Sequence, residues 1–386
     1  MPIDRTFSRG TPAGRPDRSG FTLVEILVVV VIIVILVGLL VPALSGARNS
    51  AKKAATRAQM QAFMSAVGAY RADKQALPGV WGVSQVADRT NLANDSIGYG
   101  ISMMQSVVLD LAGGVVGRGA NATITDSANE FEMQLPRVSV NHNINDRVVI
   151  DLRRIGSTDG PQYLQLNKDN FGTPEGRVFQ NKHYVKSTEN TFFKWARIPE
   201  MIDGNGLPVL LWMQDPLASA GDTFASLSYN SQTNNQTPPH SKFYWGTNAN
   251  ALSSRQLGPG RANQSYESCL GRPGPTSAAS ATGTGGGSTA SDVDVVLSLQ
   301  ALLGNPAFPT FGQPPQEGPT VNIINTPPDI KYPAVARGEI ILHAAGNDQV
   351  FLRKTANRTR AVFDDSAPSL DKGRLIDEFD DFVEAQ

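Results

Sequence analysis

The sequence predicts an α+β protein in which a long N-terminal helix, transmembrane in its first half, packs on an antiparallel β-sheet with large loop-rich insertions. Three observations indicate this fold class. An apolar run near the N-terminus is long enough to cross a membrane, small residues continue a helical spacing after it, and short apolar runs bounded by Gly, Asn, Pro and Asp follow. The 36 Gly and 25 Pro in 386 residues favour a loop-rich body over a helical bundle.

The membrane span is predicted at residues 21–44. Residues 26–41 carry no polar side chain. As a helix, residues 21–44 would extend about 36 Å, which exceeds a hydrocarbon core of about 30 Å. No second apolar run of this length occurs in the sequence. One membrane span is therefore expected.

Glu25 separates three interpretations of this span. A secretory signal peptide would be cleaved near residues 45–47, and a plain single-pass anchor would need no charge. Neither explains Glu25, because an ionised carboxylate near the start of a membrane helix costs about 2.5 kcal/mol or more and normally has a partner. In the third interpretation, cleavage after Gly20 makes Phe21 a free amine one helical turn from Glu25. In a helical stack of subunits, that carboxylate can pair with the amine of a neighbour and set the register.

The run Gly20-Phe21-Thr22-Leu23-Val24-Glu25 resembles the signature of the type IV prepilin family. The resemblance implies cleavage after Gly20 by the prepilin peptidase, a membrane aspartic peptidase, and N-methylation of Phe21. It also implies three further partners: other pilin or pseudopilin subunits, an inner-membrane assembly platform and membrane lipid. Many pilins carry a proline at the position of Pro42, which is expected to take part in assembly as a flexible stretch, or alternatively to end the span.

Charge alone does not orient the span. The segment 1–20 carries four arginines, but Arg48, Lys52, Lys53 and Arg57 follow the span closely, so both flanks are basic. The cleavage motif instead places the leader 1–20 in the cytoplasm. The expected location is the bacterial inner membrane, with the body in the periplasm or at the cell exterior.

The helix is expected to continue through residues 45–77. Small and apolar residues recur at spacings of three and four and predict one narrow small-residue face: Ala47, Ala51, Ala54, Ala55, Ala58, Ala62, Ala66, Val67 and Tyr70. Pro78 and Gly79 stop the helix. Its end, with Tyr70 and Asp73 ahead of Leu77-Pro78, resembles the end of the long helix in the major pseudopilins of type II secretion.

The body is read as a globular α+β unit at 78–273, a Gly/Ser/Thr-rich linker at 274–291 and a C-terminal subdomain at 292–386. Strands are predicted at 147–152, 163–166, 207–213 and 339–343. The last of these is expected to form a β-hairpin with 350–353 across a Gly-Asn-Asp turn. Helices are predicted at 101–111 and 293–303.

Calcium is a possible cofactor of the acidic C-terminal subdomain. Residues 341–348 resemble a Ser-Ala-Gly-x-Asp-Gly segment of G-type pseudopilins, in which an acidic loop binds calcium, although Gln349 replaces the usual Gly. The resemblance implies oxygen ligands of the kind Ca²⁺ prefers, from Asp348, Asp364, Asp365, Asp377, Asp380 and Asp381. The alternative is a solvated acidic tail, because residues 364–386 hold eight acids against Lys372 and Arg374.

Several classes of function have no support in the sequence. The net charge of −1 gives no reason to expect nucleic acid as a partner. The four histidines are too far apart for metal-ligand spacing, and Cys269 alone cannot form an intrachain disulfide. No motif joins a nucleophile to a base, so no enzyme activity is expected.

The sequence therefore predicts a structural subunit of a type II secretion pseudopilus or a type IV pilus-like filament. The helix end and the Gly-Asn-Asp segment favour secretion, and the large body favours a minor or lineage-specific subunit. The alternative is a membrane-anchored extracytoplasmic binding protein, for polysaccharide or cargo, that does not polymerise. An anchored enzyme with an unrecognised site is a third hypothesis.

Overall fold

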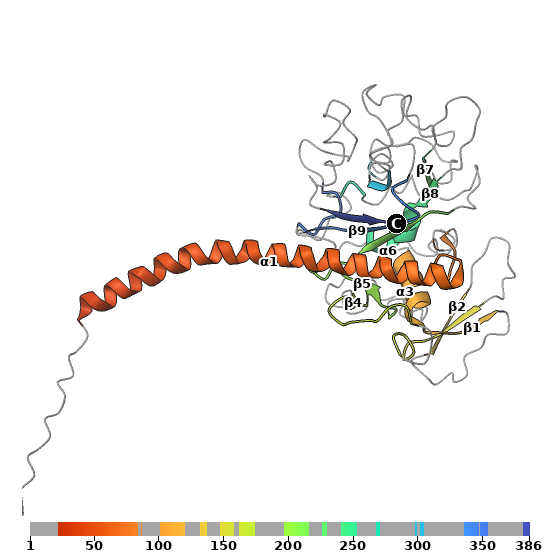
Figure 1. Cartoon of the computed structure of the whole chain (residues 1–386), viewed down its shortest axis with the longest axis horizontal. Helices are drawn as coiled ribbons and strands as arrows, with labels where there is room; N and C mark the ends of the chain where they lie inside the picture. The colour runs from red at the N-terminus through yellow and green to blue at the C-terminus, as the bar shows by residue number, and fades with distance from the viewer. Residues whose placement is uncertain are drawn as a thin grey trace, which may run out of the picture. The chain divides into compact units, whose positions relative to one another are not determined.

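The computed structural model describes residues 22–83, 86, 101–119, 132–136, 147–157, 162–173, 197–215, 226–229, 241–252, 268–270, 298, 302–304, 336–346, 348–353 and 381–386. The chain divides into two compact units, residues 1–51 and 52–386. Antiparallel sheets accompany one long helix, which confirms the predicted α+β class (Figure 1). The predicted linker 274–291 lies outside the described residues.

Helix α1 (Leu23–Lys74) is a single element of 52 residues and confirms the long helix expected over 21–77. It continues through Pro42, so this proline does not end the helix even though a prolyl nitrogen donates no hydrogen bond. After the last turn, Gln75 adopts φ +55, a left-handed conformation that commonly follows a helix end. The chain then leaves the helix ahead of Pro78, as predicted.

Within the larger unit, α1 buries one face. Met60, Phe63 and Val67 are each at most 1% exposed, and their spacing of three and four places them on one side of the helix. The predicted small-residue face is divided by this arrangement. Of its members in this unit, Ala66 and Val67 are buried and Tyr70 is half-buried, whereas the remaining four are exposed: Ala54, Ala55, Ala58 and Ala62.

Helix α3 (Met103–Ala112) confirms the helix predicted at 101–111 and is buried along nearly its whole length. Its start is fixed by a capping box, in which the backbone N of Gln105 donates to Ser102 Oγ (3.2 Å) and Ser102 N donates to Gln105 Oε1 (3.0 Å). The Gln105 amide also donates to Ile198 O (2.9 Å), so its buried polar atoms join the helix to the chain ahead of β5 (Glu200–Met201).

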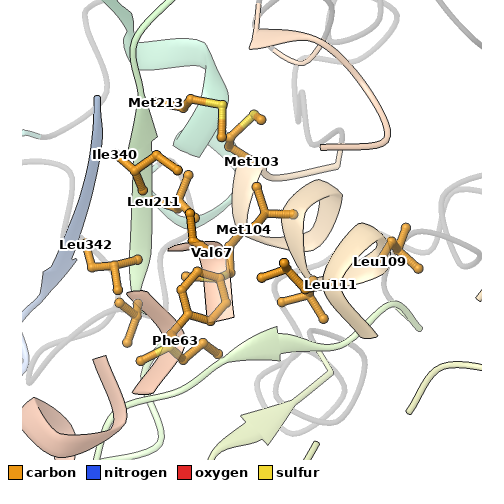
Figure 2. Packing of buried hydrophobic residues seen from close by; sticks show 14 of the residues in the cluster. Phe63, Val67, Met103, Met104, Leu109, Leu111, Leu211, Met213, Ile340 and Leu342 are labelled. Carbon is orange, nitrogen blue, oxygen red and sulfur yellow. The ribbon is translucent and has the colours of Figure 1, made fainter. Parts of the chain in front are cut away.

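The central sheet has the strand order β10-β9-β6, formed by Phe382–Ala385, Ile340–Ala344 and Leu210–Met213. Every residue of β6 and β9 is buried, because both faces of the sheet are covered. Leu211 and Leu342 face α1 and α3 in the first core, where Phe63 and Val67 point toward them (Figure 2). Trp212 and Ile341 face the opposite way, into a second core.

The second core is closed by short elements: η2 (Trp245–Asn248), α6 (Ala249–Leu252) and the turns at 268–270 and 348–353. Asn248 joins this layer to the sheet. Its side chain accepts from Leu211 N (3.3 Å) and donates to Leu211 O (2.9 Å), which covers part of the outer edge of β6. Of the predicted helix 293–303, Ser298, Leu302 and Leu303 are helical, and the other residues lie outside the described part of the chain.

The remaining strands form three small sheets. β1 (Val115–Gly119), β3 (Arg147–Asp151) and β2 (Glu132–Pro136) lie in that order, and β3 confirms the strand predicted at 147–152. β4 (Phe171–Gly172) pairs with β5, and β7 (Ser226–Tyr229) pairs with β8 (Ser241–Tyr244). The strand predicted at 163–166 is wrong. Its first two amides, of Tyr163 and Leu164, both donate to Leu111 O at the end of α3 instead of to a strand.

The predicted hairpin between 339–343 and 350–353 is also wrong. β9 pairs with β6 on one side and with β10 on the other, and residues 348–353 form turns apart from a bridge between Arg353 and Ser268. The solvated-tail interpretation is wrong for Asp381, whereas Glu384 is half-buried and Gln386 is exposed. Asp381 and Phe382 are buried, and Gln386 O accepts from Glu339 N (2.7 Å) beside the strand pair.

Polar contacts fix the second half of α1 to the body. At its end, Tyr70 OH donates to Asp110 Oδ2 (2.7 Å), which also accepts from Gly79 N (2.9 Å), while Arg118 binds the other carboxylate oxygen (3.2 Å). Desolvation, and then the hydrogen bond to Asp110, raise the pKa of Tyr70 above its ordinary value. Asp110 therefore joins α1, the turn after it and β1.

A tight turn at 203–206 binds an earlier part of the same helix. Gly204 N donates to Thr56 Oγ1 (3.0 Å), and Lys52 Nζ donates to Asn205 Oδ1 (3.0 Å). A Cβ atom on Gly204 would lie 3.1 Å from Lys52 O, so a larger residue there would push the turn away from the helix. The turn is thus shaped to approach the backbone of α1.

A buried polar pair joins the second core to β10. His343 Nε2 contacts Asp381 Oδ2, which also accepts from Leu352 N (3.0 Å), and neither side chain of the pair is exposed. Leu352 has φ +45, an unfavourable conformation for a leucine that the Asp381 hydrogen bond helps to hold. Burial, and then the positive charge of Arg337, lower the pKa of His343 to about 3.

We expect Phe63→Ala to lower the free energy of unfolding by about 3–5 kcal/mol, because the fully buried ring would leave a cavity between α1 and the sheet. Gln61→Ala is the control. It changes an exposed residue of the same helix and should shift the value by no more than about 0.5 kcal/mol. Urea denaturation of the full chain in detergent micelles, followed by tryptophan fluorescence, measures both. Equal small losses would contradict the packing described.

The buried His343 predicts acid sensitivity. The unfolded chain binds a proton at this residue below its ordinary pKa of 6.5, but the folded chain does not until about pH 3. The free energy of unfolding should therefore fall as the pH falls through this window, by up to about 1.4 kcal/mol per pH unit. In His343→Gln the side-chain amide can still donate to Asp381 but does not titrate, so urea denaturation should show a shallower pH dependence. Parallel curves for the two proteins would exclude His343 as the cause.

Candidate functional site

The candidate site is the start of α1, where a polar side chain precedes the apolar segment. Thr22 is the residue before the helix, and Glu25 lies in its first turn. Glu25 N donates to Thr22 Oγ1 (3.2 Å), and Thr22 N donates back to Glu25 Oε2 (2.8 Å). This reciprocal arrangement is a capping box, which satisfies two backbone donors that a helix start leaves unpaired.

Only one oxygen of the Glu25 carboxylate takes part in the cap. Thr22 Oγ1 also donates to Oε2 (2.8 Å), so the hydrogen bonds to this carboxylate all use one oxygen. Oε1 has no partner among the described residues, and Glu25 is exposed. An ionised carboxylate with an open oxygen at the first turn of an apolar helix can accept a further donor, such as an ammonium group.

The predicted processing residues Gly20 and Phe21 lie outside the described residues. Thr22 was missed by the sequence reasoning, which considered Glu25 only as a partner for an amine. The signal was present, because Thr22-Leu23-Val24-Glu25 has the Thr-x-x-Glu spacing of a capping box. The structure therefore adds a local role for Glu25 beside the predicted intermolecular one.

The apolar segment after the cap is uncovered. The large hydrophobic residues of α1 from Leu23 to Leu40, and Leu44, are 48–81% exposed, and an 18-residue window of the helix has a mean hydropathy of 3.5 with no buried residues. Length and composition suit one membrane crossing. So much exposed apolar surface needs lipid or another protein around it.

The predicted calcium ligands are only partly described. Asp348 Oδ1 accepts from Val350 N (3.0 Å), and Asp381 contacts His343 and Leu352. Asp364, Asp365, Asp377 and Asp380 lie outside the described residues. Within the described part of the chain, no group of three His, Cys, Asp or Glu side chains is arranged to hold a metal ion. Calcium binding stays a prediction.

Trp81 and Trp212 belong to the two cores and not to a ligand-binding surface. Trp81 is 3% exposed and packs in the first core, and Trp212 is fully buried in the second. Trp195 lies outside the described residues. The aromatic side chains whose burial is described at these positions therefore serve packing.

Comparison with known proteins adds one finding at the candidate site. Residues 15–41 match a family model described as the prokaryotic N-terminal methylation motif. No curated protein and no solved structure matches the chain. The matched segment includes Gly20, Phe21, Thr22 and Glu25 and most of the apolar run. The chain thus carries, at the start of α1, the N-terminal motif that marks type IV pilin-like proteins for prepilin processing.

Proposed function

We propose that this protein is a structural subunit of a type II secretion pseudopilus or type IV pilus-like filament. The prepilin peptidase cleaves it after Gly20, and it assembles with other pilin or pseudopilin subunits through α1. It is held in the bacterial inner membrane by one span before assembly, with its body in the periplasm or at the cell exterior. The observation that carries the proposal is Glu25 at the start of an uncovered apolar helix, inside the matched methylation motif.

The geometry of Glu25 supports a role between subunits. Its Oε2 atom caps the helix of its own chain, while Oε1 has no partner among the described residues. After cleavage, the amine of Phe21 in a neighbouring subunit supplies the missing cation. In an apolar environment an isolated charge is costly, whereas two opposite charges in contact avoid most of this cost. Neighbouring subunits are therefore held in the register that brings the two charges together.

The exposed face of α1 in the larger unit also suits helix packing. Ala55, Ala58, Ala62, Ser65, Ala69 and Ala72 follow one another at alternating steps of three and four and are all exposed. This is the spacing of a heptad seam, and small side chains allow two helix backbones to approach closely. The seam supports packing of α1 against α1 of a neighbouring subunit.

The competing function is a membrane-anchored binding protein, for polysaccharide or cargo, that uses the same leader only for export. Such a protein stays monomeric and has no use for the Glu25 charge. The two functions can therefore be separated by the assembly state of the processed chain and by the effect of removing that charge.

Mass spectrometry of the N-terminal peptide, from protein isolated out of its native membranes, tests the processing. We expect a chain that begins with N-methylated Phe21. A chain that begins near Arg48 would indicate ordinary signal-peptide cleavage and removal of the apolar helix, which overturns the proposal. An uncut Met1 would contradict it equally.

Glu25→Gln should abolish filament assembly while leaving insertion and processing intact. A glutamine can still accept from Thr22 N and so keep the capping box, but it carries no charge for a neighbouring amine. The expected loss of assembled filament, measured by shearing and immunoblotting, is therefore caused by the charge and not by fraying of the helix.

Two further variants sharpen this test. Glu25→Ala removes the charge and the cap together, and Thr22→Ala weakens the cap alone. We expect Glu25→Ala to match Glu25→Gln in assembly and Thr22→Ala to retain most of it. Normal filaments from Glu25→Gln would favour the anchored binding protein.

A further inference from the structure

Residues 381–386 lie along the edge of the central sheet, and we call this segment the strap. Its strand β10 pairs with β9 and is the outer strand in the order β10-β9-β6. The first two residues of the strap are buried, the next two are half-buried and the remaining two are exposed. The strap is therefore anchored mainly at one end.

Two adjacent residues form the anchored end. Asp381 Oδ2 contacts His343 Nε2 and accepts from Leu352 N (3.0 Å) in the turn 348–353. Phe382 belongs to the first core, and the Arg57 guanidinium of α1 lies 4.9 Å from the centre of its ring. The strap thus holds the turn 348–353 with one side chain and contacts α1 with the next.

The turn 348–353 is strained where the strap holds it. Leu352 has φ +45, which is unfavourable for a residue with a side chain. Its amide is bound by Asp381, and its carbonyl accepts from the backbone N of Cys269 (2.8 Å), a residue with no exposed surface. Loss of the Asp381 contact would let Leu352 return to an ordinary conformation. Departure of the strap therefore relaxes the turn and uncovers Cys269.

The exposed end of the strap is held through its backbone. Gln386 O accepts from Glu339 N (2.7 Å), and Gln386 N donates to Ile340 O (3.0 Å). The two chains approach so closely that a Cβ atom on Gly338 would lie 2.4 Å from Gln386 O. A glycine at position 338 is thus required for the strap to dock fully.

Most of the larger unit does not depend on the strap. The strap contributes one buried residue, Phe382, to the first core, and Val383 packs at the border of the second. The packing of α1 and α3 on β6 and β9 uses other side chains. Segments with few buried contacts open at a lower free energy than the whole domain.

We propose that the strap opens as one unit while the rest of the larger unit stays folded. Opening relaxes the turn 348–353 and frees the edge of β9, whose backbone groups can then pair with another extended segment. The inference rests on contacts within the larger unit and requires neither processing nor filament assembly, so it and the proposed function can fail separately.

Cys269 allows a direct test, because it is the only cysteine in the chain and is buried. The full chain in dodecyl maltoside micelles is treated with N-ethylmaleimide, and mass spectrometry follows the modified fraction over time. The reagent is kept at concentrations where the rate is proportional to it. The rate expected from global unfolding is the unfolding constant, from urea denaturation, multiplied by the rate for an exposed thiol.

We expect alkylation of Cys269 to be faster than global unfolding allows and to change little at low urea, because a local opening exposes little surface. A rate equal to the global-unfolding value, with the same steep dependence on urea, would overturn the proposal.

Gly338→Ala tests whether the strap moves as one unit. The added methyl group displaces Gln386, at the opposite end of the strap from Asp381. We expect the alkylation rate of Cys269 to rise by about tenfold or more, and Asp381→Ala to raise it similarly. Deuterium exchange of the amides of residues 339–344 should rise in both variants, because release of β10 uncovers β9.

The matched control is Glu384→Gln, which changes a half-buried strap residue but keeps the backbone pairing and should leave the alkylation rate unchanged. Urea denaturation followed by tryptophan fluorescence gives the global stability of each variant, against which its rate is compared. An unchanged rate in Gly338→Ala would contradict a strap that opens as one unit. Faster alkylation without faster exchange at 339–344 would confine the opening to the turn 348–353 and would also overturn the proposal.

Discussion

The packing of α1 against the β6–β9 strands is the interaction on which the body depends. Phe63 and Val67 meet Leu211 and Leu342, and α3 covers the same core. The rest of the larger unit is arranged around this contact. The strands are buried on both faces because the second core covers the side that α1 leaves open, and β10 extends the sheet beside β9. Polar side chains such as Asp110 and Asn205 then fix the helix at separate points along its length.

The same helix meets two requirements that differ along its length. From Ile26 to Leu40 it is apolar on every side and uncovered, as a helix in lipid is. In the larger unit only one face is buried, and the exposed face carries alanines. A strongly amphipathic pattern is absent from the first part because lipid has no polar side to match. The change from an apolar sequence to one with a single buried face marks where the helix passes from a lipid environment to packing against the body.

Local sequence patterns were sufficient to predict the elements that depend on local interactions. The span, the helix end before Pro78, α3 behind the Ser102 cap and the apolar strand β3 all follow from propensity, capping or burial. The pairing of β9 could not be predicted in this way, because it is a contact between segments that are distant in the sequence. The nearest apolar run, 350–353, suggested a hairpin, whereas β9 pairs with β6 on one side and with β10, a short strand within an acidic stretch, on the other. Asp381 was expected to face solvent because it lies in an acidic stretch. Its buried partner, His343, is 38 positions away, so no local pattern indicates the contact.

The candidate site was predictable in its residues but not in its geometry. Glu25 follows from the motif, and the Thr-x-x-Glu spacing also indicates the cap by Thr22. That the hydrogen bonds to Glu25 all use one carboxylate oxygen is visible only in three dimensions. For the acidic residues 364, 365, 377 and 380 the calcium hypothesis stays a prediction, since the described part of the chain does not include them.

Asn248 has a consequence for the behaviour of the body among many copies of itself. Its side-chain amide accepts a hydrogen bond from Leu211 N and donates one to Leu211 O, as the backbone of a neighbouring strand would. An open strand edge recruits other chains, and the danger grows with crowding. Asn248 occupies the Leu211 N–H and C=O groups, so a strand of another copy cannot pair with them. One polar side chain thereby interrupts the row of free backbone groups that an edge strand would otherwise offer at this position.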